Sequence, residues 1–316
     1  MIDKIVIAGG NGFLGTALAR HFKPGAREIV VLARNFFEAG PGIVLKRWDG
    51  ETLGDWAQAL DGADALINLC GKNVNCRYTE KNRALIYNSR VKSTRVLGMA
   101  ASKCRVPPAV WINSSSATIY RASFTKLMTE EDGEIGDDFS MNVCKTWESE
   151  FNSIQLPQTR KIIFRTGIVF GNQGGALPAL QGLVKMGVGY QGDGRQYCSW
   201  IHELDFCRAV EFVINNRHAE GIYNVVSPLP LRNSELMEAL REVMEVRVSI
   251  PVPRWVLELG AMVIRTETEL VLKSRKVFPK RLLDEGFVFE FQDGKTALKE
   301  LCRKKATIRR AFISSP

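Results

Sequence analysis

A glycine-rich turn near the start of the chain is the feature that most constrains its fold. The apolar run Ile5–Ala8 predicts a buried strand, and Gly9, Gly12 and Gly15 follow it directly. Apolar residues then recur at helical spacing as far as Phe22. The glycines therefore lie where a strand turns into a helix, which is the context in which such a pattern predicts dinucleotide binding.

Each glycine of this turn has its own expected role. Gly9 permits the tight turn, Gly12 lets the backbone approach a pyrophosphate, and Gly15 lets the helix pack against the strand. The free N–H groups and the dipole of the helix N-terminus favour an anion. The alternative is an ordinary glycine-rich turn without a ligand. We expect the cofactor to contact Gly9, Asn11, Gly12, Phe13, Leu14 and Gly15.

The end of the second expected strand, Glu28–Ala33, bears on the choice between NAD and NADP. A protein specific for NAD usually places Asp or Glu there, to hold the ribose hydroxyls of the adenosine. This chain has Ala33 followed by Arg34, and a guanidinium can grip a 2′-phosphate with a forked pair of hydrogen bonds. The sequence therefore predicts NADP(H), with a solvated surface arginine as the alternative.

Further expected cofactor contacts lie at the ends of the later strands. Asp49 follows the expected strand Ile43–Arg47 and could accept from the adenine amino group or cap a helix beginning near Leu53. Gly71, after the strand Ala63–Leu69, would allow backbone and ligand to pass closely. Carboxyl ends of parallel strands meet at the crevice where open α/β sheets bind ligands. The remaining contacts expected there are Leu69, Cys70, Ser114 and Thr166.

The alternation of strands and helices predicts the fold class. Expected helices at Thr79–Lys103 and Phe139–Ile154 separate the strands Val110–Asn113 and Lys161–Thr166. This order implies βαβ units, and hence a Rossmann-type, doubly wound and mainly parallel sheet in an α/β protein. We assign residues 1–170 and about 197–227 to an NADP-binding domain. A smaller C-terminal substrate-binding lobe takes residues 171–196 and 228–316.

The second half of the chain carries weaker patterns. We expect Gly171–Gly194 to be a flexible insertion with one short amphipathic stretch, Leu177–Met186. Lys126–Asp138 is expected to be an exposed acidic segment. Trp200–Asp205 is expected to open a helix, and a further helix is expected at Pro253–Ile264. The alternating residues Gly286–Phe291 predict a strand.

Composition excludes several classes of protein. The chain is 45% hydrophobic and 24% charged, as in an ordinary globular protein, and no apolar run approaches the length that crosses a bilayer. Its seven cysteines are scattered, which favours reduced thiols in the cytoplasm over disulfides or a zinc site. The net charge of +9 suits phosphorylated ligands, and no recognisable module argues for nucleic acid.

Several motifs together resemble the extended short-chain dehydrogenase/reductase superfamily, and within it an atypical epimerase-like family. Ser-Trp-Ile-His and Trp-Glu are the more family-specific pieces. The resemblance implies a Rossmann sheet with a C-terminal substrate lobe, NADP(H) as cofactor, and Ser116 as the residue that hydrogen-bonds the reacting oxygen. The matching motifs are Gly-Gly-Asn-Gly-Phe-Leu-Gly (9–15), Asn-Leu-Cys-Gly (68–71), Ser-Arg-Val (89–91), Trp-Glu (147–148), Arg-Thr-Gly-Ile-Val-Phe (165–170), Gly-Gly-Ala-Leu (174–177), Ser-Trp-Ile-His (199–202) and Gly-Phe-Val-Phe (286–289).

The chain departs from the superfamily at the acid/base pair. None of its six tyrosines is followed by Lys four residues later. Spacing from Ser116 places Met141 at the tyrosine position and keeps Lys145. Alignment on Trp-Glu places Ser140 or Cys144 there instead and leaves no Lys. The catalytic candidates are therefore Ser116, Cys144 and Lys145.

These observations predict an NADP(H)-dependent oxidoreductase-like protein acting on a small carbonyl, alcohol or sugar-like substrate. The alternative is a non-catalytic protein that senses NADP(H) or serves as a scaffold. We expect no metal, because His202 with its nearby carboxylates lacks the spacing of a ligand set and fits a structural hydrogen bond better. A second copy of the chain, in a homodimer, is the macromolecular partner considered.

Overall fold

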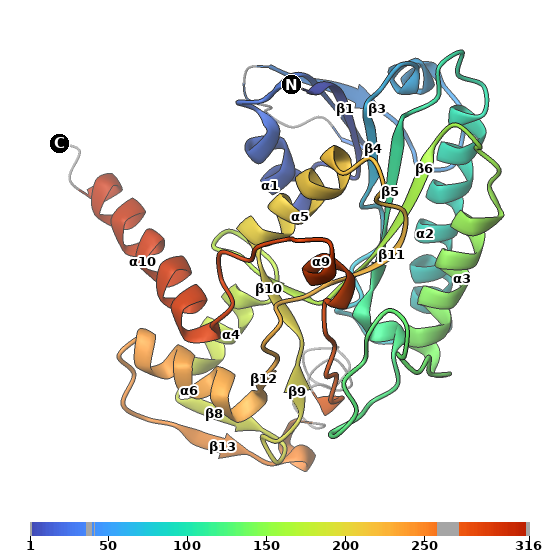
Figure 1. The fold of residues 1–316 in the computed structure, drawn as a ribbon. Helices are drawn as coiled ribbons and strands as arrows, with labels where there is room; N and C mark the ends of the chain where they lie inside the picture. Colours follow the sequence, from blue (N-terminus) through green and yellow to red (C-terminus); the bar gives the residue numbers. More distant parts are fainter. Residues whose placement is uncertain (1, 36–39, 41, 258–271, 314–316) are drawn as a thin grey trace. The chain divides into compact units, whose positions relative to one another are not determined.

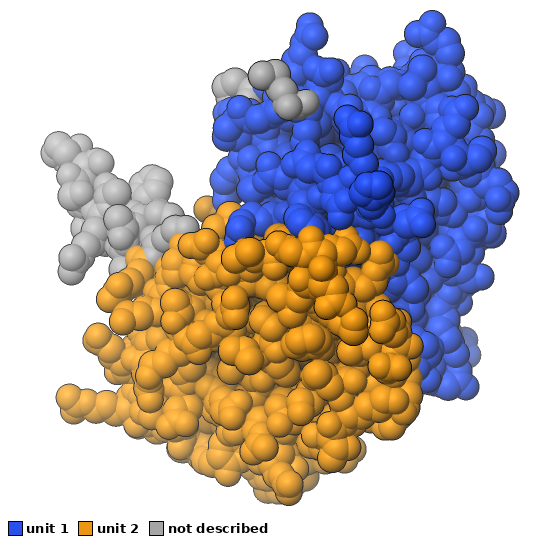
Figure 2. All heavy atoms as spheres, viewed as in Figure 1, with its two compact units in different colours: residues 1–119, 135–166, 207–223 blue, residues 120–134, 167–206, 224–316 orange. Residues whose placement is uncertain are grey.

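The computed structural model describes residues 2–35, 40, 42–257 and 272–313, with side chains as far as Arg303. The chain folds into two compact units, and each unit is built from three separate segments of the sequence (Figure 2). Unit 1 comprises residues 1–119, 135–166 and 207–223, and unit 2 comprises residues 120–134, 167–206 and 224–316.

Unit 1 is organised around a seven-stranded sheet with the order β11-β6-β5-β4-β1-β2-β3. The pairs β1–β2, β2–β3, β1–β4, β4–β5 and β5–β6 are all parallel, so these strands end at one edge. The Rossmann-type, doubly wound sheet predicted from the sequence is confirmed. Its strands are β1 (Ile2–Ala8), β2 (Ala26–Ala33), β3 (Ile43–Arg47), β4 (Ala65–Asn68), β5 (Val110–Ser116), β6 (Arg160–Thr166) and β11 (Gly221–Val225).

Helices cover both faces of this sheet, with α2 and α3 side by side on one of them (Figure 1). Side-chain caps fix where these two helices begin: Thr79 accepts from the Asn82 amide, and Asp138 accepts from the Met141 amide. The opposite face carries α1 and α5 (Figure 1). The elements are α1 (Phe13–Phe22), α2 (Glu80–Ala101), α3 (Phe139–Ser153), α5 (Glu203–Asn215, which starts in unit 2) and the short 3₁₀ helices η1 (Asp55–Leu60) and η2 (Ala117–Ile119).

A core of buried apolar side chains lies between the sheet and the α2–α3 layer. Val30 and Leu32 of β2 and Trp111 of β5 contribute from the strands, and Leu97 and Phe151 from the two helices. Burial of this apolar surface is the main favourable contribution to folding of such a layer. The core therefore holds the strand ends in fixed positions relative to α2 and α3.

Unit 2 has a hydrophobic core of its own, in which Trp200 stacks on Phe170 with ring centroids 5.5 Å apart. Its elements are β7 (Ile168–Phe170), α4 (Leu177–Lys185), β8 (Val188–Gln191), β9 (Tyr197–Cys198), β10 (Trp200–His202), β12 (Leu231–Arg232), α6 (Asn233–Val243), β13 (Ile250–Val252), α9 (Lys280–Asp284) and α10 (Gly294–Ile313).

Three expectations for unit 2 need correction. Within residues 171–194 the amphipathic stretch expected at Leu177–Met186 is confirmed as α4, but Leu177 and Val184 pack in the unit's core and the strand β8 follows, which the sequence did not predict. Residues 200–202 form β10, parallel to β7, and the helix starts only at Glu203. Within the segment 126–138, Met128 is fully buried and its amide donates to Lys276. In each case tertiary packing overrides the local pattern.

The alternating segment Gly286–Phe291 is also not a strand. Phe287 and Phe289 are buried and Val288 is exposed, so the alternation is real. The amides of Glu290 and Phe291, however, donate to the two carboxylate oxygens of Asp205 instead of to another strand. The helix expected at Pro253–Ile264 lies largely outside the described residues.

Candidate cofactor and active site

In the glycine turn between β1 and α1, Gly12 is the glycine that the packing of the protein does not require. Gly9 has a φ of +76°, and a Cβ at Gly15 would lie only 2.3 Å from the Cα of Gly10. A Cβ at Gly12 would meet only the carbonyl oxygen of Gly9, at the ordinary distance of 3.5 Å. The fold itself therefore requires Gly9 and Gly15, whereas Gly12 keeps a surface open at the N-terminus of α1.

The N-terminus of α1 suits an anion. Gly12 is its N-cap, no side chain caps it, and no acidic residue stands in its first turn. Asn11 and Gly12 are exposed, while Phe13 and Leu14 are half-buried. No carboxylate in the helix's own first turn therefore opposes an anion at its first amides.

A pocket of about 600 Å³ lies beside the end of β2. Arg34, Lys46 and Arg47 line it together with Trp48 and Asp49. Three cations in one pocket provide the charge that a phosphorylated ligand requires. The pocket therefore suits a phosphorylated ligand.

Asp49 holds the turn that follows β3. Its carboxylate accepts from the amides of Glu51 and Thr52, both at 2.8 Å, and from the Thr52 hydroxyl. These hydrogen bonds, led by the one from the Thr52 side chain, lower the pKa of Asp49 to about 2. Asp49 does not cap η1, whose N-cap is Gly54 and has no side-chain hydrogen bond, so the expected helix cap is not formed. The contact of Asp49 with adenine stays a prediction.

The end of β4 is held against the glycine turn. A Cβ on Gly9 would lie 3.1 Å from the sulfur of Cys70 and 3.2 Å from the carbonyl carbon of Leu69. Burial raises the pKa of Cys70 to about 12, and the Arg34 guanidinium opposes that rise. Cys70 is therefore a neutral packing group beneath the turn.

A buried network of polar side chains ties this edge to α2 and α3. The Asn68 amide nitrogen donates to Asn113 Oδ1 at 2.7 Å and to Thr94 Oγ1 at 3.1 Å. Trp147 Nε1 donates to the same Thr94 hydroxyl at 2.9 Å. Because buried polar groups are costly when unpaired, the network specifies one arrangement of the strand ends and helices.

The serine run continues β5 and does not form a loop. Ser114 and Ser116 are half-buried and pair in register with Phe164 and Thr166 of β6. The Ser116 hydroxyl donates to Thr118 Oγ1 at 2.9 Å. The Thr118 amide donates to the same hydroxyl at 3.2 Å, and the Thr166 carbonyl oxygen lies 3.5 Å from it.

Ser115 points the other way, into a buried ion pair. Its hydroxyl donates to Glu148 Oε1 at 2.6 Å. Arg165 Nε and Nη2 donate to the two oxygens of Glu148 at 2.9 and 2.7 Å. These two residues belong to the Trp-Glu and Arg-Thr-Gly-Ile-Val-Phe motifs, and their pairing explains why both motifs occur. The sequence carried no signal for the pairing itself.

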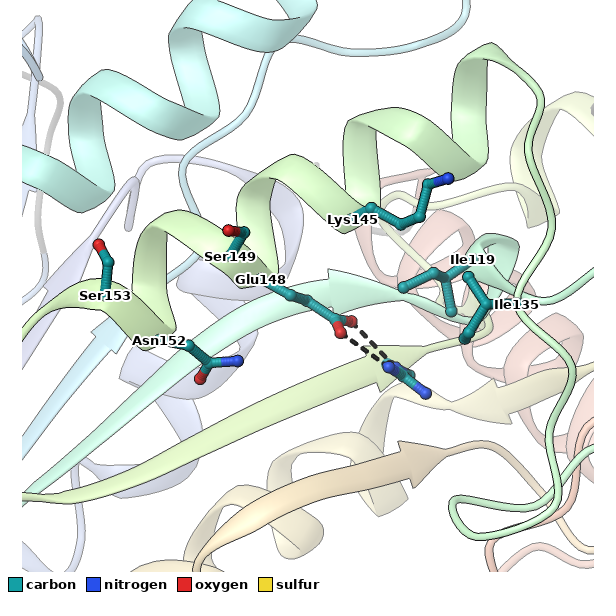
Figure 3. Close-up of a pocket in the computed structure, with 8 residues that line it drawn as sticks. Ile119, Ile135, Lys145, Glu148, Ser149, Asn152 and Ser153 are labelled. Carbon is teal, nitrogen blue, oxygen red and sulfur yellow. Dashed lines mark hydrogen bonds and ion pairs between the residues drawn. The ribbon is translucent and has the colours of Figure 1, made fainter.

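Helix α3 carries the residues that the two alignments place at the acid/base pair. Met141 and Cys144 are buried, and the Lys145 ammonium pairs with Asp137 Oδ1 at 2.6 Å. In Figure 3 the Lys145 side chain and the Glu148 carboxylate point away from each other, and Glu148 reaches toward β6. Both residues line a shallow pocket of about 620 Å³ with Arg165, Ser149 and Asn152.

Arg90 of α2 is the residue near this edge to which the sequence assigned no role. A Cβ on Gly71 would lie 3.0 Å from its Cζ. The structure thus gives a different reason for Gly71 than passage of a ligand, because the guanidinium occupies the space of a side chain. Only the motif Ser-Arg-Val pointed to this arginine.

Among the described residues, no group of three His, Cys, Asp or Glu side chains could hold a metal ion. His202 Nε2 lies 3.2 Å from Glu300 and its Nδ1 accepts from the Leu204 amide, so it has the structural role predicted from the sequence. Burial lowers the pKa of His202. None of the seven cysteines, all within the described residues, takes part in a disulfide. A search of the described helices finds none with the length and apolar character needed to cross a membrane.

The parallel sheet and its glycine turn define the class of Rossmann-type nucleotide-binding folds. Within this class the chain belongs to the NAD dependent epimerase/dehydratase family, whose sequence model matches residues 5–226. Residues 252–301 match a domain of unknown function, DUF1731. The family predicted from the motifs is confirmed.

Relatives of the whole chain bear the same family name. Epimerase family protein SDR39U1 of Homo sapiens is 30% identical over 305 residues, which cover 94% of this chain and 99% of the relative. Epimerase family protein YfhF of Bacillus subtilis is 30% identical over 309 residues, covering 96% and 100%.

Solved structures confirm the fold. The crystal structure of human SDR39U1 (isoform2) with NADPH has a TM-score of 0.84 at 28% identity, covering 95% of this chain and 99% of that one. MoeE5 in complex with UDP-glucose and NAD has a TM-score of 0.76 at 17% identity, covering 96% of this chain and 99% of that one. The latter likeness concerns the fold alone.

Proposed function

We propose that the chain binds NADP(H) along the carboxyl edge of its parallel sheet. The open surface at Gly12 is the observation that carries this proposal, because nothing in the protein's own packing needs a glycine there. The contacts proposed are those expected from the sequence, from Gly9–Gly15 and Arg34 to Thr166. NADPH in the crystal structure of human SDR39U1 supports the choice of cofactor.

The proposed activity is an NADP(H)-dependent oxidoreductase acting on a small carbonyl, alcohol or sugar-like substrate. The bound cofactor would supply or accept the hydride. Ser116 would turn its hydroxyl from Thr118 to the reacting oxygen of the substrate. Residues 1–170 and about 197–227 would form the cofactor domain, and residues 171–196 and 228–316 the substrate lobe. Seven cysteines without a disulfide favour the cytoplasm.

One observation favours a second function, namely NADP(H) sensing or scaffolding without turnover. Met141, at one of the two aligned tyrosine positions, is buried and has no group that can transfer a proton. Oxidation of NADPH by a panel of carbonyl compounds separates the two functions. Turnover above the rate of a Gly12→Val variant supports the enzyme, and tight NADPH binding without turnover supports the sensor.

Arg34 should confer preference for NADP(H) over NAD(H). Arg34→Ala is expected to weaken NADPH binding by about 10- to 150-fold, because a hydrogen bond to a charged group contributes roughly 1.5–3 kcal/mol. NADH binding should change little. Fluorescence titration of wild type and variant with both cofactors measures this. Equal wild-type affinity for the two cofactors contradicts the prediction, and Arg27→Ala, on the start of β2, is the control.

Three substitutions should identify the catalytic groups if turnover occurs. Ser116→Ala should lower kcat by about 10²-fold through loss of a hydrogen bond to the reacting oxygen. Cys144→Ser should lower kcat by roughly 10²- to 10⁴-fold if the thiol is the proton donor. Lys145→Met should instead weaken NADPH binding about tenfold if the ammonium holds ribose hydroxyls. Full activity of Ser116→Ala, with brisk epimerisation of a UDP-sugar by wild type, contradicts this mechanism.

A further inference from the structure

Arg90 lies between the proposed pyrophosphate site and the proposed reaction centre. The neighbouring strands β2, β1, β4 and β5 end side by side at one edge. Arg34 follows β2, the glycine turn follows β1, and Gly71 follows β4. A dinucleotide that runs along this edge from Arg34 to Ser116 would carry its nicotinamide ribose past Gly71, where the Arg90 guanidinium lies.

Part of Arg90 has a structural task. Its Nη1 donates to the carbonyl oxygens of Lys72, at 3.2 Å, and Ile86, at 3.0 Å. The neighbouring Ser89 hydroxyl accepts from the Lys72 amide at 2.8 Å. Ser89 and Arg90 of α2 therefore hold the loop after β4 through the backbone amide and the backbone carbonyl of Lys72.

The other edge of the guanidinium, formed by Nε and Nη2, makes no hydrogen bond with the described residues, and Arg90 as a whole is half-buried. These two nitrogens lie 3.3 and 3.1 Å from the position that a Cβ on Gly71 would take. The guanidinium makes a cation–π contact with the Trp147 ring, whose centroid is 5.1 Å from Cζ.

We propose that the free edge of Arg90 binds the hydroxyl oxygens of the nicotinamide ribose. This inference rests on the proposed NADP(H) site. It gives the chain a fixed cation at the reactive half of the cofactor, where the family's lysine is absent under one alignment and Lys145 pairs with Asp137 in the structure. A forked guanidinium can hold two adjacent hydroxyls at once, which a lysine cannot do with the same geometry.

A truncated cofactor tests this assignment. Binding of NADPH and of 2′,5′-ADP, which lacks the nicotinamide half, is measured for wild type, Arg90→Met and Arg90→Lys. Arg90→Met should weaken NADPH about tenfold or more, as expected for loss of a charged hydrogen bond, and leave 2′,5′-ADP within about twofold. The fluorescence of bound NADPH, which reports on the nicotinamide ring itself, should change as well.

Controls separate this role from a purely structural one. Arg95→Met removes another arginine of α2, one paired with the exposed side of α3 through Glu150, and should leave both ligands unchanged. Equal weakening of NADPH and 2′,5′-ADP by Arg90→Met would show that Arg90 only supports the Lys72 loop. Unchanged NADPH binding would also overturn the proposal. If Arg90→Met does not fold, Arg90→Lys takes its place in the test, because an ammonium cannot form the fork and should still weaken NADPH selectively.

Failure of the proposed function gives a different result. Wild type that binds neither NADPH nor 2′,5′-ADP contradicts the cofactor site as a whole, and the Arg90 contact with it. Wild type that binds both ligands, with Arg90→Met indistinguishable from it, contradicts only the assignment of Arg90.

Discussion

Gly12→Val should abolish NADP(H) binding while leaving the fold intact. The backbone of Gly12 is extended, with φ −82° and ψ 174°, and valine adopts such angles readily. The new side chain would stand over the N-terminus of α1, where the proposed pyrophosphate binds. Loss of several charged hydrogen bonds, each of roughly 1.5–3 kcal/mol, predicts a fall in affinity of at least about hundredfold.

NADPH titration and thermal unfolding monitored by circular dichroism measure the two parts of this prediction. Gly25→Val is the matched control, because a Cβ there meets nothing within 4 Å and the residue follows the other end of α1. Gly15→Val is the opposite case and should impair folding, since its Cβ would collide with the backbone of Gly10. A folded Gly12→Val protein with normal NADPH affinity would refute the phosphate site.

Glu148→Ala should cost about 3–5 kcal/mol of unfolding free energy. The side chains of Glu148 and Arg165 are only 9% and 8% exposed, so removal of the carboxylate takes away the negative charge that neutralises a buried guanidinium. The penalty of an unpaired buried charge, rather than the strength of the ion pair itself, sets this magnitude. Ser115 would lose its acceptor at the same time. Denaturant unfolding of the purified variant measures the change.

Glu150→Ala is the matched control on the same helix. Glu150 pairs with Arg95, whose side chain is 59% exposed, and such pairs contribute about 0–1 kcal/mol. Replacing both members of the buried pair, Glu148→Met with Arg165→Met, should destabilise the protein less than Glu148→Ala alone. A loss of less than about 1 kcal/mol for Glu148→Ala would mean that water or another group compensates Arg165.

The sequence predicted the sheet because buried parallel strands are short apolar runs whose ends are marked by glycine or polar residues. It failed where an apolar alternation finds a partner other than a strand. Phe287 and Phe289 enter the core, yet Asp205, far away in the sequence, takes the backbone amides of residues 290 and 291. Trp200 likewise lies in a strand and not in the expected helix, because β10 pairs with β7. The local sequence pattern does not indicate this pairing.

The candidate site was predictable only where a residue acts through its own backbone or its position at a strand end. Gly9 and Gly15 fall in this class, since a positive φ and a helix–turn contact follow from the motif itself. Gly71 is needed because Arg90 of α2 lies against it, and Glu148 is buried because it pairs with Arg165 of β6. Such pairings require the three-dimensional arrangement, and Asp49 shows that a carboxylate near a site can be engaged by its own loop.

The hydrogen-bonded group of Asn68, Thr94, Asn113 and Trp147 has a consequence for how this protein tolerates change. Each member satisfies another, so a single replacement leaves at least one buried donor or acceptor unpaired. The costs of replacing two members together should then be smaller than the sum of the separate costs. Substitutions at these four positions should therefore be correlated among related proteins. Replacement of one residue should favour compensating replacements of the other three.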